Sequence, residues 1–383
     1  MATSNTLTGV IPTLYSALNV VSREMVGFIP AVQRDSTAER AALNQTVRAP
    51  IGVSGDLEDV TPGQLPASSG GTTVSYADVT ITKSKAAPIL WSGEEQRSVG
   101  QTGVINSVLR DQFADGMRKL VNAIEVDIAD AAKKGASRAY GTAGTAPFGT
   151  AGDLSDVAQI RKILEDNGAP TSDLQLVLNS AGMANIRGKQ NVLFKVNEAG
   201  SSDMLRNGMT DRLEGFALRN SAGLTAHTKG TGASLQVNHA AYSVGDRTIT
   251  LDTGTGTVLA GDVVTFAGDS NKYVVNTAYA SNALTIGKPG LLAALADDTA
   301  MTVGNSYTPN IAFARSAIVL AARAPALPDG GDSADDRITI TDPISGLTFE
   351  VSLYRQYRQV KYEIAMAWGV GTPNSAHIAT LLG

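Results

Sequence analysis

The sequence contains no cysteine and only three histidines. Without cysteine the chain can form no disulfide, has no thiol nucleophile and offers no cysteine-ligated zinc site. The histidines are scattered, and none has a second histidine or a carboxylate at a helical metal-ligand spacing: His227, His239 and His377. The G-x-S-x-G motif of a hydrolase serine is also missing. These absences predict a protein that is not an enzyme and that uses no metal and no cofactor.

Charge is sparse as well. Charged residues make up 17% of the chain, below the roughly 25% that is usual for soluble domains. Lysine and arginine form no run, so we expect no dedicated nucleic-acid surface. No apolar run approaches the roughly 18 residues of a membrane span, and the first residues lack the basic start of a signal peptide. These patterns predict a soluble protein made in the cytoplasm, with no membrane partner.

Three segments invite a chemical interpretation but do not support one. Residues 182–190, GMANIRGKQ, depart from a phosphate-binding loop in glycine spacing, and Gln190 stands where Ser or Thr would bind magnesium. Residues 254–261, GTGTVLAG, lie inside a β-patterned run and indicate a turn. Residues 328–337, PDGGDSADDR, depart from the spacing of a calcium loop and lack its last Glu. We expect this acidic segment to be a solvated turn or a charged contact with a neighbouring subunit.

Hydrophobic periodicity predicts two helices in the first third of the chain. The first has its apolar face at Leu14, Leu18, Val21 and Met25. The second spans residues 102–134, about 50 Å long, with an apolar stripe at Leu109, Phe113, Met117, Leu120, Ile124, Ile128 and Ala131. Between them, residues 45–92 alternate in polarity around a centre rich in Pro, Gly and Ser. That pattern predicts a long two-stranded β-hairpin that extends from the rest of the chain. Such an extension needs a partner surface, because an isolated hairpin is only marginally stable.

The rest of the chain divides into three parts by pattern. Residues 140–226 mix helical and strand patterns. Residues 227–309 contain a series of short strand patterns separated by turns, at intervals typical of a small β-barrel or β-sandwich. From residue 310 the pattern returns to longer strands. The segment 207–223, NGMTDRLEGFALRNSAG, is punctuated by glycines and carries no reactive side chain, so it predicts a turn followed by a strand. The fold class expected from these patterns is α+β.

Taken in order, these segments resemble the major capsid (coat) protein of tailed bacteriophages, which has the Hong Kong-97 fold. The family's recurrent turn and strand is similar to the segment holding Gly208, Gly215 and Phe216. Its C-terminal ending is similar to YEIAMAWGVGTPNSAHIATL, which contains Trp368 and Pro373. The β-patterned insert resembles the inserted barrel of the Salmonella-type short-tailed phage coat proteins. The resemblance implies structural or assembly roles for Gly208, Gly215, Phe216, Leu120, Ile124, Trp368 and Pro373.

The resemblance also implies a domain organisation and partners. The domains would be the N-arm, 1–44; the E-loop, 45–92; the P-domain with its spine helix, 93–139; the A-domain, 140–226; the inserted β-barrel domain, 227–309; and return strands completing the A- and P-domains, 310–383. Hexamers and pentamers of this homo-oligomer would form an icosahedral virion shell enclosing double-stranded DNA without sequence-specific binding. Assembly would occur in the bacterial host cytoplasm. Expected partners are a portal, a decoration protein and, because the sequence begins at the arm, a separate scaffolding protein.

Two alternatives stay open, and a third is disfavoured. An encapsulin-like compartment would share the fold but enclose an enzyme, although the insert and the long extension at 45–92 argue against it. A β-barrel adhesion or carbohydrate-binding protein would bind glycans through residues 227–309 and stay monomeric. A hydrolase is disfavoured by the missing catalytic motifs.

Overall fold

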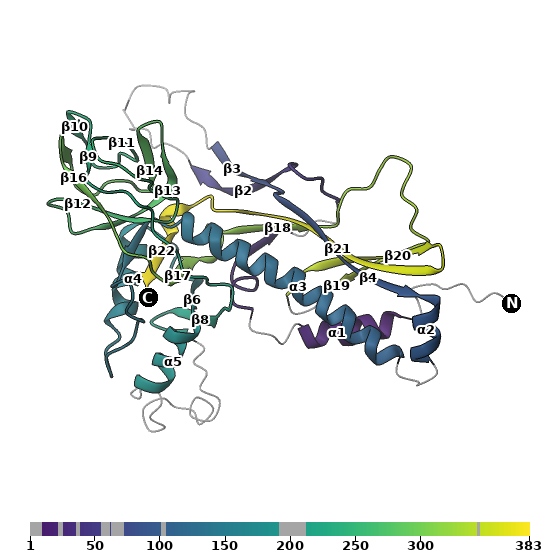
Figure 1. Ribbon diagram of the computed structural model, residues 1–383. Coiled ribbons are helices and arrows are strands. Elements are labelled where there is room, and N and C mark those ends of the chain that lie inside the picture. The colour runs from purple at the N-terminus through teal and green to yellow at the C-terminus, as the bar shows by residue number, and fades with distance from the viewer. Residues whose placement is uncertain are drawn as a thin grey trace.

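A computed structural model describes residues 10–21, 26–35, 39–54, 62, 73–100, 105–190, 212–342 and 345–383. Figure 1 shows their arrangement. The α-helices in these ranges are α1 (Ile11–Val21), α2 (Gly93–Gly100), α3 (Ile105–Lys134), α4 (Ser155–Asp166) and α5 (Ser180–Lys189). Strands form two large sheets, of six and twelve strands, which confirms the α+β class. Within the described ranges no helix is both long and apolar enough to cross a membrane.

The six-stranded sheet is organised around the long strand β21 (Gln359–Gly371). Along one edge β21 pairs with β4 (Lys83–Ser92). Along the other it pairs first with β20 (Thr348–Gln356) and then with β18 (Val319–Arg323). The sheet is completed by β19 (Asp336–Thr341) beside β20 and by β1 (Gln33–Asp35) beside β18. Segments from both ends of the chain therefore share one sheet.

Helix α3 lies across this sheet (Figure 1). Six of the seven residues in its predicted stripe are buried, and Ala131 is half-buried. The ring of Phe113 meets Tyr362 of β21 edge-on, with ring centres 5.5 Å apart. Helix α1 packs against α3 through Leu14, Ala17, Leu18 and Val21, whereas Met25 lies outside the described residues. The periodicity of the sequence thus predicts both helices and the faces that they bury.

A two-stranded arm is formed by β2 (Thr46–Ser54) and β3 (Thr73–Thr80). One face of its base is buried where Val47 and Val79 join a small cluster with residues of β18 and β21. Successive side chains of a strand alternate between faces, so Val74 and Tyr76 lie on the opposite face, where they are 42% and 54% exposed.

The two-stranded extension expected over residues 45–92 is shorter in the structure, where the paired strands are β2 and β3. The last strand in this range, β4, does not belong to the arm but pairs with β21. The reason is that Ile89 and Trp91 of β4 are buried, and Trp91 Nε1 donates a hydrogen bond of 2.7 Å to Gln112 Oε1 of α3. Alternating polarity predicts a strand but does not identify its partner.

The twelve-stranded sheet begins with six strands that lie between two cores. In spatial order they are β5 (Arg138–Tyr140), β22 (Ile378–Leu382), β17 (Pro309–Ala314), β6 (Leu174–Leu178), β8 (Phe216–Asn220) and β7 (Arg212–Leu213). Ile311 and Phe313 of β17 join the core shared with α3. Ala312 and Ala314 join the core that α4 and α5 cover. Burial on both faces explains why the sequences of β6, β17 and β22 are mostly apolar.

The other six strands of this sheet close into a barrel. The ring runs β13 (Lys272–Ala280), β14 (Ala283–Ile286), β11 (Thr248–Asp252), β9 (Leu235–Val237), β16 (Ala300–Val303), β12 (Val263–Phe266) and back to β13. A separate pair, β10 (Ala241–Tyr242) and β15 (Leu295–Ala296), lies beside it. The ring is not isolated, because β13 also pairs with β5, joining Tyr273 to Arg138 and Lys272 to Ala139. A bridge between His227 and Tyr307 marks where the chain enters and leaves the barrel.

Candidate functional site

Four of the residues singled out from the sequence lie in the two large cores described above. Leu120 and Ile124 of α3 are buried, and they share one core with Trp368 of β21. Phe216 is fully buried in the other core, beneath α4. Pro373 is half-buried in the turn after β21, and Gly208 lies outside the described residues. Within the described ranges, the side chains at these positions contribute to packing, and Gly215 to a turn.

Gly215 forms the turn of a tight hairpin. Leu213 of β7 and Phe216 of β8 are paired, which leaves a two-residue connection in which Glu214 and Gly215 have φ angles of +48° and +88°. Two positive φ values are the signature of a type I′ turn, which favours glycine. Arg161 Nη1 of α4 donates a 2.6 Å hydrogen bond to the carbonyl of Glu214 and holds this hairpin against the helix.

Trp368 is fixed by a polar contact as well as by packing. Its indole Nε1 donates to Asp127 Oδ2 of α3 over 2.8 Å, although the residue is fully buried. Lys83 of β4 donates to the other oxygen of Asp127 over 2.5 Å. One carboxylate of α3 therefore holds both the edge strand β4 and its neighbour β21 in the six-stranded sheet.

Sequence reasoning missed Glu125, a buried carboxylate that accepts four hydrogen bonds. Its carboxylate is buried in α3 and accepts hydrogen bonds from the backbone N–H groups of Gly27, Phe28 and Ile29, at 2.7, 2.7 and 3.1 Å. Ser221, just after β8, donates a fourth over 2.6 Å. A buried charge is tolerated only when it is well hydrogen-bonded. The one signal in the sequence is an acidic residue directly beside the apolar stripe position Ile124.

The approach of the N-terminal segment to Glu125 requires glycine at position 27. A Cβ atom built there would lie 2.8 Å from the carbonyl oxygen of Asn220 and 2.9 Å from Ser221 Cβ. The next residue, Phe28, is fully buried and stacks on Phe313 of β17, with ring centres 6.0 Å apart. Segments distant in sequence are thus brought together around one carboxylate.

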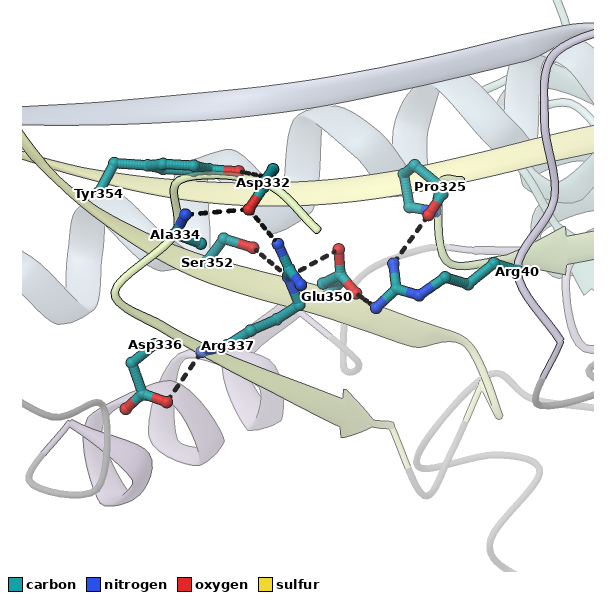
Figure 2. Close-up of polar contacts among 9 residues, drawn as sticks. All are labelled: Arg40, Pro325, Asp332, Ala334, Asp336, Arg337, Glu350, Ser352 and Tyr354. Atoms are coloured by element: carbon teal, nitrogen blue, oxygen red, sulfur yellow. Dashed lines mark hydrogen bonds and ion pairs between the residues drawn. The ribbon is translucent and has the colours of Figure 1, made fainter. Parts of the chain in front are cut away.

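A second buried carboxylate, Glu350 of β20, lies between two arginines (Figure 2). Arg40 pairs with its Oε2 and also donates to the carbonyl of Pro325 over 2.8 Å. Arg337 of β19 lies 3.6 Å from its Oε1 and reaches Asp332 at 2.5 Å. This network ties the segment before the arm to the six-stranded sheet.

The acidic segment 328–337 is largely engaged by its own chain. Asp332 accepts from Ala334 N–H, from the Tyr354 hydroxyl and from Arg337 (Figure 2), and these contacts lower its pKa. Asp335 pairs with Arg355 at 3.2 Å, and Asp336 accepts from the N–H of Arg337. Over the described ranges no group of three or more His, Asp or Glu side chains could hold a metal ion.

Of the histidines, His227 has the most defined polar partner. Its Nε2 lies 2.8 Å from Asp262 Oδ1 at the root of the barrel, and both side chains are buried. Asp262 also accepts from the N–H groups of Gly230 and Leu259. Such a pair can orient two chain segments. His239 contacts the carbonyl of Ala241, and the Nδ1 atom of His377 is buried with no hydrogen-bond partner in the described structure.

Comparison with known proteins gives similarity at the level of solved structures. No family model and no curated protein matches the sequence. The capsid of the cyanophage P-SCSP1u is 10% identical, with 94% of this chain and 88% of that chain covered and a TM-score of 0.48. The cyanophage A-1(L) capsid asymmetric unit is 9% identical, with 100% and 94% covered and a TM-score of 0.46. A virus-like particle from Pyrococcus furiosus is 10% identical, with 97% and 98% covered and a TM-score of 0.44. Because each TM-score is below 0.5, the function must be inferred from the chain's own residues.

Proposed function

We propose that this chain is the major capsid protein of a tailed bacteriophage, and that its copies assemble into an icosahedral shell around double-stranded DNA. The observation that carries the proposal is the β2–β3 arm. Its base is buried against β18 and β21, but Val74 and Tyr76 face away from the chain's own core. Two strands with exposed apolar side chains are stabilised when a neighbouring copy covers them.

The order of the elements supports the same function. A first helix, an arm, a long helix across a sheet, and then a mixed sheet that carries a barrel follow the Hong Kong-97 order implied by the resemblance. On this basis the N-arm, E-loop, P-domain, A-domain, inserted barrel and return strands are proposed at the boundaries given above, with β4 contributing to the P-domain sheet. Gly215, Phe216, Leu120, Ile124, Trp368 and Pro373 would hold the shape of a subunit, as would Gly208.

The proposed role needs no catalysis and no sequence-specific DNA contact. With 36 acidic and 31 basic side chains, the chain would contain DNA rather than bind it tightly. Hexamers and pentamers would form in the host cytoplasm with a scaffolding protein, a portal and a decoration protein as partners. An encapsulin-like compartment is the alternative with the same fold. A free-standing adhesion barrel is less well supported, because β13 is hydrogen-bonded into the base through β5.

The test is assembly of the wild-type chain and of two variants at Tyr76. Each is expressed in bacteria together with the genes that adjoin its own, then examined by sedimentation velocity and negative-stain electron microscopy. We expect wild-type shells, or the tubes and spirals of misdirected assembly. Tyr76→Asp should remain as small species with an unchanged circular dichroism spectrum, whereas Tyr76→Phe, which keeps the ring, should assemble.

Two results would contradict the proposal. Wild-type chain that stays monomeric or dimeric with all adjoining genes present would exclude a shell protein. Normal shells from Tyr76→Asp would exclude the arm as the contact that assembly requires. Shells that contain an enzyme rather than nucleic acid would favour the encapsulin-like alternative.

A further inference from the structure

A polar cavity of about 320 Å³ lies where α4, β5 and the start of β13 meet. The barrel joins the rest of the twelve-stranded sheet in this region (Figure 1). The charged side chains that line the cavity are Arg138, Lys162, Lys272 and Asp166, with the amides of Gln159 and Asn271 also on its wall. Three cations therefore face one carboxylate, in a chain whose net charge is −5.

The buried member of this set, Arg138, is incompletely satisfied. Only 6% of Arg138 is exposed, and its Nε atom is buried with no hydrogen-bond partner in the described parts of the chain. Its Nη2 atom makes three long contacts with the end of α4: 3.4 Å to the carbonyl of Ile163, 3.2 Å to Asn167 Oδ1 and 3.5 Å to Asp166 Oδ2. These contacts position the guanidinium at the C-terminal end of α4, where the helix dipole is negative. Asp166 is half-exposed and 3.5 Å away, so it neutralises little of the charge of Arg138.

The two lysines add charge that the described residues do not neutralise. Lys272 Nζ donates to the carbonyl of Gly141 over 2.5 Å, and no carboxylate within the described ranges pairs with it. Lys162, exposed on α4, likewise has no ion pair in those ranges. A single cation of this kind would be unremarkable. Two lysines beside a buried arginine in one cavity create a local positive potential.

A second carboxylate, that of Asp269, precedes the lining residues Ser270 and Asn271 in the chain and is held by hydrogen bonds. Asp269 accepts from the backbone N–H and the side-chain amide of Asn271, at 2.9 and 2.6 Å, and from the Tyr273 hydroxyl at 2.5 Å. Burial, followed by this hydrogen bond, raises the pKa of Tyr273, so the phenol stays neutral and adds no negative charge. Hydrogen bonds from neutral donors leave the charge of Asp269 in place, so three cations stand against two carboxylates and the surroundings of the cavity keep a net positive charge.

We propose that this cavity binds a phosphate-type oxyanion, either inorganic phosphate or the phosphate group of a small metabolite. Guanidinium and ammonium groups are the side chains that bind such anions most strongly. The volume accommodates a phosphate together with several water molecules, each of which needs about 30 Å³. The bound anion would bridge α4 to Lys272, at the start of the barrel strand β13. It would thereby hold the barrel against the rest of the chain. This inference does not depend on the proposed function.

Equilibrium dialysis of the full-length chain with radiolabelled inorganic phosphate tests the site, with ionic strength held constant by sodium chloride. We expect saturable binding of one phosphate per chain, displaced by sulfate but not by chloride. The Lys162→Met, Lys272→Met double variant should bind about tenfold more weakly or worse, since it removes two of the three cations that line the cavity. Lys189→Met combined with Lys229→Met removes the same charge elsewhere and should bind as the wild type does.

A parallel titration with glycerol 3-phosphate separates the two sources. Tighter binding than inorganic phosphate would assign the site to a phosphorylated metabolite, and equal or weaker binding would assign it to free phosphate. The proposal is overturned if no saturable phosphate binding occurs, or if the Lys162/Lys272 variant and its control bind phosphate equally. Circular dichroism of both double variants shows whether a loss of binding comes with a loss of folding.

Discussion

Ser221 Oγ donates a 2.6 Å hydrogen bond to Glu125 Oε1, the same oxygen that accepts the backbone N–H groups of Gly27 and Phe28. The two residues are 96 positions apart in the chain. The N-terminal segment, the long helix and the end of β8 therefore share one buried carboxylate. Residues 27–29 thus dock on a carboxylate that Ser221 also holds, so their position depends on how α3 and the end of β8 are placed.

The first prediction concerns Glu125. Glu125→Gln keeps the size of the side chain but removes its charge and turns an N–H₂ group toward backbone donors. We expect the free energy of unfolding to fall by about 3 kcal/mol, as when a buried charged hydrogen-bond network is broken. Urea unfolding of the unassembled chain measures this. The control Asp115→Asn, in an exposed pair with Lys119 on the same helix, should change it by less than about 0.5 kcal/mol.

Ser221→Ala tests the other end of the same contact. It removes one donor but leaves three backbone N–H groups on the carboxylate, so the expected loss is about 1–2 kcal/mol. The loss in the Glu125→Gln, Ser221→Ala double variant should be smaller than the sum of the single losses, because the two residues share a network. Full additivity would show that they act independently.

The second prediction compares two glycines. Gly215→Ala places a Cβ on a residue with φ of +88° and should destabilise the chain by about 1 kcal/mol. Gly188 lies in α5 with open space where its Cβ would be. Gly188→Ala should therefore stabilise by about 0.5–1 kcal/mol, because alanine is the better helix former. Thermal unfolding of both variants checks the opposite signs, and a shift of the same sign would contradict the turn assignment.

The third prediction concerns the dependence of stability on pH. Burial lowers the pKa of His377 from its ordinary value of 6.5. A lowered pKa in the folded state contributes stability that is complete above 6.5 and is lost as the pH falls through the folded pKa. The melting temperature of wild-type chain should therefore fall, relative to that of His377→Gln, between about pH 7.5 and pH 5. Parallel curves for the two proteins would show that His377 does not contribute.

The fourth prediction concerns the paired arginines at Glu350. Arg40→Met leaves the buried carboxylate with the more distant Arg337 and should cost about 2 kcal/mol, because a buried charge loses its closer partner. Adding Glu350→Gln to Arg40→Met should recover part of that loss. Arg48→Met removes an exposed pair with Asp78 and is the matched control, expected within about 0.5 kcal/mol of wild type. Denaturant unfolding measures all four proteins.

Local patterns predicted the elements better than their partners. The stripe of α3 could be read from the sequence because helical periodicity depends on residues three and four apart. The partner of β4 could not, because Ile89 and Trp91 alternate in the same way whether the strand pairs with β3 or with β21. Glu125 was missed for a related reason, since its hydrogen-bond donors at positions 27–29 and 221 come from distant segments.

The candidate site shows the same division. The turn expected from the glycines of residues 207–223 is found at Gly215, because a positive φ is a local requirement. The cavity at Arg138 has no motif, because its cations come from β5, α4 and β13. Only the fold brings them within reach of one ligand.

The pairing of β13 with β5 also limits how the barrel can be gained or lost. A domain attached only by two linkers can be removed without affecting the rest of the chain. Here, however, the barrel strand β13 pairs with β5, which belongs to the sheet outside the barrel. Deletion of residues 227–309 would leave the edge of β5 with unpaired backbone groups, which invites pairing with another chain. The barrel therefore supplies a strand to the sheet of the rest of the chain. A chain without the barrel would need another strand beside β5, or another segment to cover that edge.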